Sequence, residues 1–333
     1  MLLKEPATIL ASLAKKEFTK EIIIEALLFK GHKQEKLFEL ARKKRAQHFS
    51  PCKVEIRSVI ELSNICQQNC NFCNINARSK IKRYVLGHEE FINIVDTIYS
   101  KGRKVILLQS GENSSRQYVD FVSTCVRTIK QKYRDMTVML CLGNLDNTQY
   151  AQLKEAGADR YVLKFETSNP ALYAQIKPSD SLEKRIHCLD RLIGLGFETG
   201  SGNMIGLPGQ TIEDIAQDLF FLSNFDLTMA SCTVFIPGQG CAYEHMPCGN
   251  LDITLNFIAL MRIMFPKILI PATSSLEKVS QGGQYRGLMA GANTVTVHDG
   301  TPEKLKTLFP IYSGDRFTPT EKYVHEIVLK AQY

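Results

Sequence analysis

Short runs of apolar and β-branched residues alternate with amphipathic segments along most of the chain. The first run, VEIRSVIEL at residues 54–62, is typical of a strand because β-branched residues are frequent in it. Seven further runs have the same character: residues 105–110, 137–143, 161–165, 198–206, 230–238, 268–273 and 294–298. Between most of them, apolar positions recur three or four residues apart, which predicts helices. These helices cover roughly residues 88–100, 115–133, 147–156, 181–195, 211–223, 252–264 and 281–290.

This alternation predicts an α/β fold with a parallel sheet, and eight strand–helix units predict a closed (β/α)8 TIM barrel. Residues 8–48 have the periodicity of a helical pair that precedes the barrel, and residues 321–331 form one more predicted helix. We find no internal repeat and no low-complexity linker. The expected organisation is an N-terminal helical extension at residues 1–48, a barrel at residues 49–316 and a C-terminal helix at residues 317–333.

Composition and charge are those of an ordinary globular protein. The 333 residues are 44% hydrophobic and 23% charged, which excludes collagen-like, disordered and coiled-coil chains. The net charge of +7 is spread along the chain, so we expect no nucleic-acid partner. The apolar run around residues 22–29 is far shorter than the roughly 18 residues of a membrane span. Charges interrupt the N-terminal segment, unlike a signal peptide, so we expect a cytoplasmic protein without a membrane partner.

Three of the ten cysteines lie close together, directly after the first predicted strand. Their spacing is Cys66-x3-Cys70-x2-Cys73, and soft thiolate ligands suit iron–sulfur clusters. Three thiolates would hold three irons of a cubane and leave the fourth iron open to a small molecule. Three alternatives remain: a structural zinc site, which prefers four ligands, a redox pair of Cys70 and Cys73, and chance burial.

This motif, with Phe72 just before its last cysteine, resembles the signature of radical S-adenosylmethionine (SAM) enzymes. Further segments resemble, in order, the group that contains the FeFe-hydrogenase maturase HydE, methylornithine synthase and biotin synthase. They are IELSNICQQNCNFC, KRYVLGHEEF, LLQSGE, LKEAGADRYVLKFET, GSGNMIGLPGQT, FIPG, MRIMFPKILIPAT and MAGAN. The resemblance covers about residues 50–310, and QSGE and GLPGQTIED look most like HydE.

The resemblance implies what the protein binds and does. A 4Fe-4S cluster on Cys66, Cys70 and Cys73 would bind SAM and cleave it reductively to a 5′-deoxyadenosyl radical. The radical would act on a small-molecule substrate inside the barrel. An electron donor such as ferredoxin or flavodoxin would reduce the cluster.

The resemblance also implies which residues contact SAM. Ser110, Gly111 and Glu112 resemble the motif that binds the methionine amino group, and Glu166 and Arg185 match SAM contacts of HydE. Where HydE has an arginine, this chain has a lysine, which offers a point charge instead of a bidentate fork. The predicted SAM-binding residues are Phe72, Ser110, Gly111, Glu112, Lys164, Glu166, Arg185 and Met204.

Candidate substrate residues follow two other strands. Thr273, Ser274 and Ser275 form a hydroxyl cluster after the seventh strand, although capping of the next helix is an alternative role. Asn144 follows the third strand, where HydE often has a glutamate. His298 ends the eighth strand, and a lone histidine is more often structural than functional.

An auxiliary cluster of the biotin synthase type would need ligands inside the barrel. The corresponding positions hold Gln109, Gly200 and Pro271, none of which is a thiolate or a guanidinium. Cys141 and Cys232 could face inward, but two ligands make a poor cluster.

The candidate reactions therefore have an order. HydE-like chemistry on a small molecule comes first, a mutase reaction like that of methylornithine synthase second, and sulfur insertion third. A non-catalytic iron–sulfur scaffold is the rival of a different class, and the residues expected at the SAM pocket argue against it.

Overall fold

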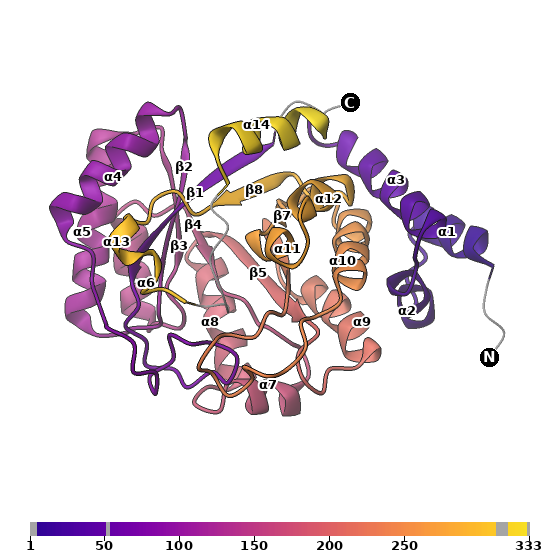
Figure 1. The fold of residues 1–333 in the computed structure, drawn as a ribbon, viewed down its shortest axis with the longest axis horizontal. Helices are drawn as coiled ribbons and strands as arrows, with labels where there is room; N and C mark the ends of the chain where they lie inside the picture. The colour runs from indigo at the N-terminus through magenta and orange to yellow at the C-terminus, as the bar shows by residue number, and fades with distance from the viewer. Residues whose placement is uncertain (1–4, 51–53, 311–318, 332–333) are drawn as a thin grey trace.

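The computed structural model describes residues 5–50, 54–310 and 319–331, in which eight parallel strands form the centre of the molecule (Figure 1). The strands are β1 (Glu55–Ser63), β2 (Val105–Ser110), β3 (Thr137–Cys141), β4 (Arg160–Val162), β5 (Glu198–Ile205), β6 (Met229–Val234), β7 (Pro271–Ala272) and β8 (Thr294–Val297). They are paired in the order β6-β5-β4-β3-β2-β1-β8-β7. Two hydrogen bonds link the chain next to the edge strands β6 and β7. The Ala230 N–H donates to the Leu269 carbonyl oxygen at 3.0 Å, and the Leu269 N–H donates to the Thr228 carbonyl oxygen at 2.9 Å. The sheet is therefore a nearly closed barrel, which confirms the predicted fold.

The predicted helices surround this barrel. They are α4 (His88–Ser100), α5 (Arg116–Lys132), α6 (Asn147–Glu155), α8 (Leu182–Gly194), α9 (Ile212–Phe221), α10 (Leu251–Met264) and α12 (Gly283–Met289). The structure adds four elements of at most seven residues: α7 (Pro170–Ile176), the 3-10 helix η1 (Leu222–Asn224), α11 (Ser274–Val279) and α13 (Glu303–Lys306). Elements this short span about two helical turns or fewer, so they leave little periodicity in a sequence. Within the described ranges, no helix has both the length and the apolar character needed to cross a bilayer.

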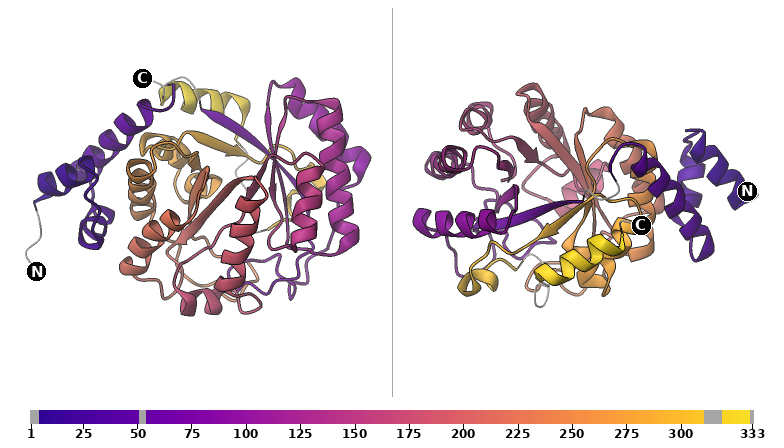
Figure 2. Two further views of the ribbon diagram at one scale, coloured as in Figure 1. Left: turned by 180° about the vertical axis from the view of Figure 1, so that it is seen from behind. Right: turned by 90° about the horizontal axis from the view of Figure 1, so that it is seen from above.

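Three helices, not the expected two, precede the barrel: α1 (Pro6–Ala14), α2 (Lys20–Leu27) and α3 (His32–Ala46). Lys16 and Gly31 have φ angles of +65° and +55°, which separate the helices because left-handed residues interrupt a right-handed helix. Figure 2 shows all three on one side of the molecule, where α2 and α3 contact α10 and α2 also contacts α9. The C-terminal helix α14 (Glu321–Lys330) contacts α12. The expected barrel boundary at residue 316 lies outside the described residues, so the domain division stays a prediction.

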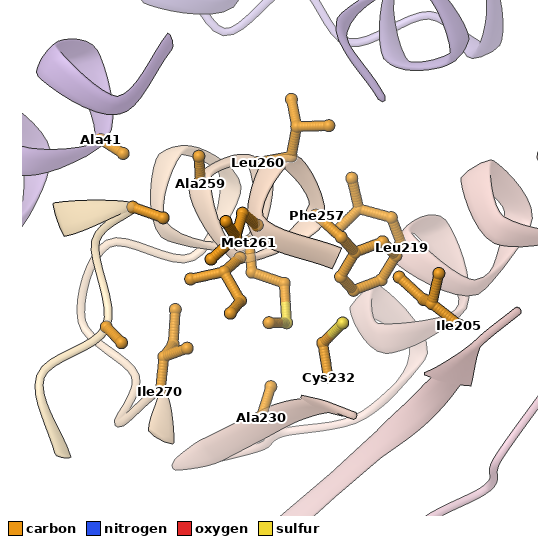
Figure 3. Packing of buried hydrophobic residues seen from close by; sticks show 14 of the residues in the cluster. Ala41, Ile205, Leu219, Ala230, Cys232, Phe257, Ala259, Leu260, Met261 and Ile270 are labelled. Carbon is orange, nitrogen blue, oxygen red and sulfur yellow. The ribbon is translucent and has the colours of Figure 1, made fainter. Parts of the chain in front are cut away.

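The layer between barrel and helices is apolar (Figure 3). Cys232 on β6 is fully buried and points toward α10, beside Phe257 and Met261. Its Sγ lies 3.8 Å from the Thr254 carbonyl oxygen of that helix. Because successive side chains of a strand point to opposite faces, its neighbour Thr233 faces the barrel interior instead. Of the two cysteines that could face inward, Cys232 therefore does not.

Candidate active site

The loop after β1 brings the three clustered cysteines to a cavity at the carboxyl ends of the strands. Cys70 is buried, and Cys66 and Cys73 are half-buried. Burial raises the pKa of all three thiols, to about 12 for Cys70. A bound metal centre would overcome this effect, because a coordinating thiol loses its proton. Three soft ligands on one loop fit a 4Fe-4S cluster, in which each thiolate binds a different iron.

The zinc alternative has no geometric support. Within the described residues, no three His, Cys, Asp or Glu side chains are placed to hold one metal ion. A structural zinc site would need four such ligands around a single point.

Arg83 fixes the conformation of the loop that carries the three cysteines, which we call the cysteine loop. Its guanidinium donates four hydrogen bonds of 2.6 to 2.9 Å to backbone carbonyl oxygens of Asn64, Ile75, Asn76 and Ser79. These carbonyls lie on both sides of the cysteines in sequence, so one side chain ties the start of the loop to its end.

Two glycines make room for the site. A Cβ atom on Gly111, which follows β2, would lie 2.3 Å from the Ile65 carbonyl oxygen and 2.8 Å from Cys66 Cβ. A Cβ atom on Gly143 would lie 2.2 Å from Oε2 of Glu112, and this residue also has a φ of +81°. Only glycine lets the backbone at position 111 approach the cysteine loop so closely, and the left-handed backbone at position 143 also favours glycine. Gly111 thus has a packing role against the cysteine loop, in addition to its predicted role in binding SAM.

Glu112 connects the cysteine loop to α8. It is 9% exposed, and its Oε1 accepts a hydrogen bond from Nε2 of Gln68 at 2.6 Å. Its Oε2 pairs with Nη2 of Arg185 at 3.3 Å. The Arg185 side chain is buried, and its Nε donates to the Tyr173 hydroxyl at 3.1 Å. The carboxylate is therefore oriented from two sides.

Asp180 lies at the centre of the same network and was not predicted from the sequence. Its side chain is fully buried, and its Oδ2 accepts hydrogen bonds from Arg185 at 2.8 Å and from the Tyr173 hydroxyl at 2.7 Å. The Lys177 ammonium lies 3.2 Å away. Burial alone would raise the pKa of Asp180, but the charges of Arg185 and Lys177 lower it to about 2. The signal in the sequence was the alternation of charges in KPSDSLEKR at residues 177–185.

Asn144, a predicted substrate residue, belongs to this network. Its Nδ2 donates to Oδ1 of Asp180 at 3.0 Å, and the side chain is buried. It is not among the residues that line the cavities of the barrel. Its position fits a role in orienting Asp180, and its contact with a substrate stays a prediction.

Glu166, four residues after the end of β4, has a strained backbone. Its φ is +63°, which is uncommon for a residue other than glycine and costs about 1–3 kcal/mol. Hydrogen bonds to β5 hold it there, from its N–H to the Gly202 carbonyl at 3.1 Å and from the Met204 N–H to its carbonyl at 2.8 Å. Its carboxylate pairs with Lys164 at 3.0 Å. Strain of this kind is typical of functional sites.

The predicted SAM-binding residues and the three cysteines line one cavity of about 220 Å³, which we call the upper cavity. Its lining includes Phe72, Ser110, Gly111, Glu112, Lys164, Glu166, Arg185, Met204, Cys66, Cys70 and Cys73. Gln68 and Lys177, which were not predicted from the sequence, also line it. The structure therefore brings the whole predicted set together, and the contacts of these residues with SAM stay a prediction.

A second cavity, the inner cavity, has a volume of about 180 Å³ and lies inside the barrel. Gln109, Cys141, Val162, Lys164 and Thr233 line both cavities, so the two are adjacent.

Among the predicted substrate residues, Thr273 and Ser274 line the inner cavity. Ser275 is fully buried outside its lining and shares a hydrogen bond of 2.8 Å with the Thr273 hydroxyl. The inner cavity is also lined by His298, which the sequence left as a lone histidine, and by Arg57, which it missed.

The positions expected for an auxiliary cluster do face the inner cavity. Gln109, Gly200 and Pro271 all line it, and none can ligate iron as a thiolate. Of the cysteines that the structure describes, Cys141 alone is part of this lining. The described residues thus supply too few ligands for a second cluster there.

Comparison with known proteins identifies the family. A family model described as the radical SAM superfamily matches residues 60–222. The [FeFe] hydrogenase maturase subunit HydE of Thermotoga maritima is 39% identical over 309 residues, which cover 92% of this chain and 87% of that protein. The chain belongs to the radical SAM superfamily. The expected enzyme class and its cofactors, a 4Fe-4S cluster and SAM, are thereby confirmed.

Other radical SAM relatives support the same conclusion. The 3-methylornithine synthase of Methanosarcina barkeri is 30% identical over 267 residues, which cover 79% of this chain and 74% of that protein. The crystal structure of methylornithine synthase (PylB) superposes with a TM-score of 0.84 and 25% identity, over 97% of this chain and 95% of that chain. The protein is therefore a radical SAM enzyme of the HydE type that acts on a small molecule, and the scaffold alternative is not supported.

Proposed function

We propose that this radical SAM enzyme holds its cluster on Cys66, Cys70 and Cys73 and binds SAM in the upper cavity. The observation that carries the proposal is the convergence of these cysteines with two carboxylates, the buried Glu112 and the half-buried Glu166, on one cavity. When bound, the cluster and SAM supply a 5′-deoxyadenosyl radical. Because the two cavities share lining residues, they adjoin, and the path from this radical to a substrate in the barrel is short.

The side chains of the upper cavity divide the recognition of SAM between them. Glu112 and Glu166 offer acceptors for the methionine ammonium and the ribose hydroxyls. Arg185 is engaged by Glu112, Asp180 and Tyr173, so its proposed role is to orient Glu112. Lys177 also lines the cavity, and an ammonium has three donors, so it can bind the SAM carboxylate while it pairs with Asp180.

The proposed reaction is HydE-like chemistry on a small sulfur- or iron-bearing molecule in the inner cavity. Identity of 39% across most of both chains favours it. An amino-acid mutase reaction is the second candidate, because the fold matches that of methylornithine synthase along nearly the whole length of both chains.

Reduction of the cluster needs an external donor, for which we propose a ferredoxin or a flavodoxin. We also propose a cytoplasmic location. The cysteines that the structure describes are all free thiols, as is usual in reducing compartments.

The test is SAM cleavage by the anaerobically reconstituted protein with dithionite as reductant. We expect 5′-deoxyadenosine and methionine from the wild-type protein and only background from Cys66→Ala, Cys70→Ala and Cys73→Ala. Cys248→Ala is the matched control because Cys248 is exposed and lines neither cavity, so this variant should cleave SAM normally. Equal cleavage by the wild-type protein and all three variants would overturn the assignment.

A further inference from the structure

A chain of hydrogen bonds runs from the inner cavity into the barrel wall. Ser274, at the start of α11, lines the cavity, and its Oγ lies 3.2 Å from Nε2 of His298. Nδ1 of His298 lies 3.2 Å from Oε1 of Glu61. Oε2 of Glu61 accepts a hydrogen bond of 3.0 Å from the Thr301 hydroxyl. The residues come from β1, from the end of β8 and from α11, so the fold itself brings them together.

The order of donors and acceptors follows from the chemistry of these groups. Glu61 is 1% exposed, and as a carboxylate it is an acceptor at both oxygens. Nδ1 of His298 therefore carries the ring proton and donates it to Glu61. Nε2 is left as an acceptor, so the Ser274 hydroxyl donates to it and keeps its own lone pairs for the cavity. Burial lowers the pKa of His298 to about 4, so the ring is neutral at pH 7 and does not reverse this order by protonation.

We propose that Ser274, oriented by His298 and Glu61, is a fixed hydrogen-bond acceptor that recognises an ammonium, hydroxyl or thiol group on the substrate. His298 and Glu61 act through Ser274 and are positioning residues. The inference rests on the proposed function in one respect, namely that the inner cavity is where the small molecule binds. It goes further because it names a chemical group that the substrate carries.

The same cavity offers a site for the other end of such a molecule. Arg57, on β1, is 3% exposed and lines the cavity, and its Nη2 is buried without a hydrogen-bond partner among the described residues. Its Nε is held by Glu55 at 2.6 Å. A guanidinium with an unused donor is suited to a carboxylate. Small carboxylates with and without a neighbouring donor group are therefore the appropriate probes.

The first experiment measures binding of three matched probes to the reconstituted, SAM-loaded enzyme without reductant, by anaerobic isothermal titration calorimetry. The probes are L-2-aminobutyrate, L-2-hydroxybutyrate and butyrate, which share one carbon skeleton. We expect the amino acid to bind about tenfold more tightly than butyrate, with the hydroxy acid between them, because only these two donate to Ser274. Equal affinity for all three probes would overturn the proposal.

Variants distinguish recognition by an oriented Ser274 hydroxyl from a general effect of the polar wall of the inner cavity. Glu61→Gln is nearly isosteric, and its amide can donate to Nδ1, which moves the ring proton to Nε2 and turns the Ser274 hydroxyl hydrogen toward the cavity. The preference for aminobutyrate over butyrate should then fall about tenfold, as it should in Ser274→Ala. Ser231→Ala is the matched control: Ser231 lines the same cavity, but its hydroxyl donates to the Ser201 carbonyl, so the preference should persist. The same loss of preference in all three variants would contradict a specific role of Ser274.

A third measurement needs no stable variant of Glu61. Nitrogen NMR of histidine-labelled wild-type protein at pH 7 should show His298 as the neutral tautomer with its proton on Nδ1, and a ring protonated on Nε2 would overturn the proposal. Failure of the proposed function would look different, because the wild-type enzyme would then form no 5′-deoxyadenosine with SAM and dithionite, whatever the probes do.

Discussion

Replacement of Asp180 by asparagine tests the buried network that supports the upper cavity. The side chain is fully buried and pairs with Arg185 and Lys177, and removal of one partner of a buried ion pair costs about 3–5 kcal/mol. Asparagine keeps one acceptor oxygen for the Tyr173 hydroxyl, so we expect a loss of about 3 kcal/mol. The pKa gives a similar figure, because a decrease from 3.8 to about 2 corresponds to about 2.5 kcal/mol of stabilisation of the charged form.

The assay is urea unfolding of the reduced, cluster-free chain at several pH values. A carboxyl group whose pKa is lowered by folding stabilises the folded state above its unfolded pKa, and this stabilisation is lost as the pH falls through the folded value. The difference between wild type and Asp180→Asn should therefore be full at pH 7 and should shrink between pH 3.8 and about 2. Asp190→Asn is the matched control, an exposed aspartate on α8, the helix that begins two residues after Asp180, and should change the unfolding free energy by less than about 0.5 kcal/mol. Equal unfolding free energies for Asp180→Asn and Asp190→Asn would refute the reasoning.

Two further predictions concern SAM binding, measured by equilibrium dialysis of the reconstituted protein. Gly143→Ala places a Cβ atom against the Glu112 carboxylate and should weaken SAM binding, whereas Gly194→Ala meets no atom within 4 Å and should not; equal affinities would contradict this role of Gly143. Glu166→Gln removes a charged acceptor and should raise the dissociation constant for SAM about tenfold, so an unchanged constant would exclude Glu166 from the SAM contacts.

The sequence predicted the barrel well because its strands are the most regular signal in the chain. The run at residues 54–62 became β1 at Glu55–Ser63, and the helix expected at about residues 211–223 is α9 at Ile212–Phe221. The short helix α11 was missed because its six residues show little periodicity. The side on which Cys232 lies depends on strand register, which a run of apolar and small residues does not reveal.

The candidate site was predictable where one loop or one strand end carries the residues. The carboxyl ends of parallel strands lie at the same end of the barrel, so residues that follow successive strands come together there. Contacts between distant positions were not predictable: Glu61 and His298 are 237 residues apart, and Asn144 and Asp180 are 36 apart. Asn144 and His298 were noticed in the sequence but Asp180 and Glu61 were not, and these contacts form only when the barrel closes.

Mössbauer spectroscopy of protein reconstituted with isotopically enriched iron tests the central claim most directly. Three thiolates leave one iron of the cubane without a protein ligand, so we predict a single 4Fe-4S cluster in which one iron site changes when SAM is added. The cluster should be absent from Cys70→Ala and present in Cys248→Ala. A cluster whose four iron sites keep the same Mössbauer signals when SAM is added would contradict the account. So would a second cluster that is still present in Cys70→Ala.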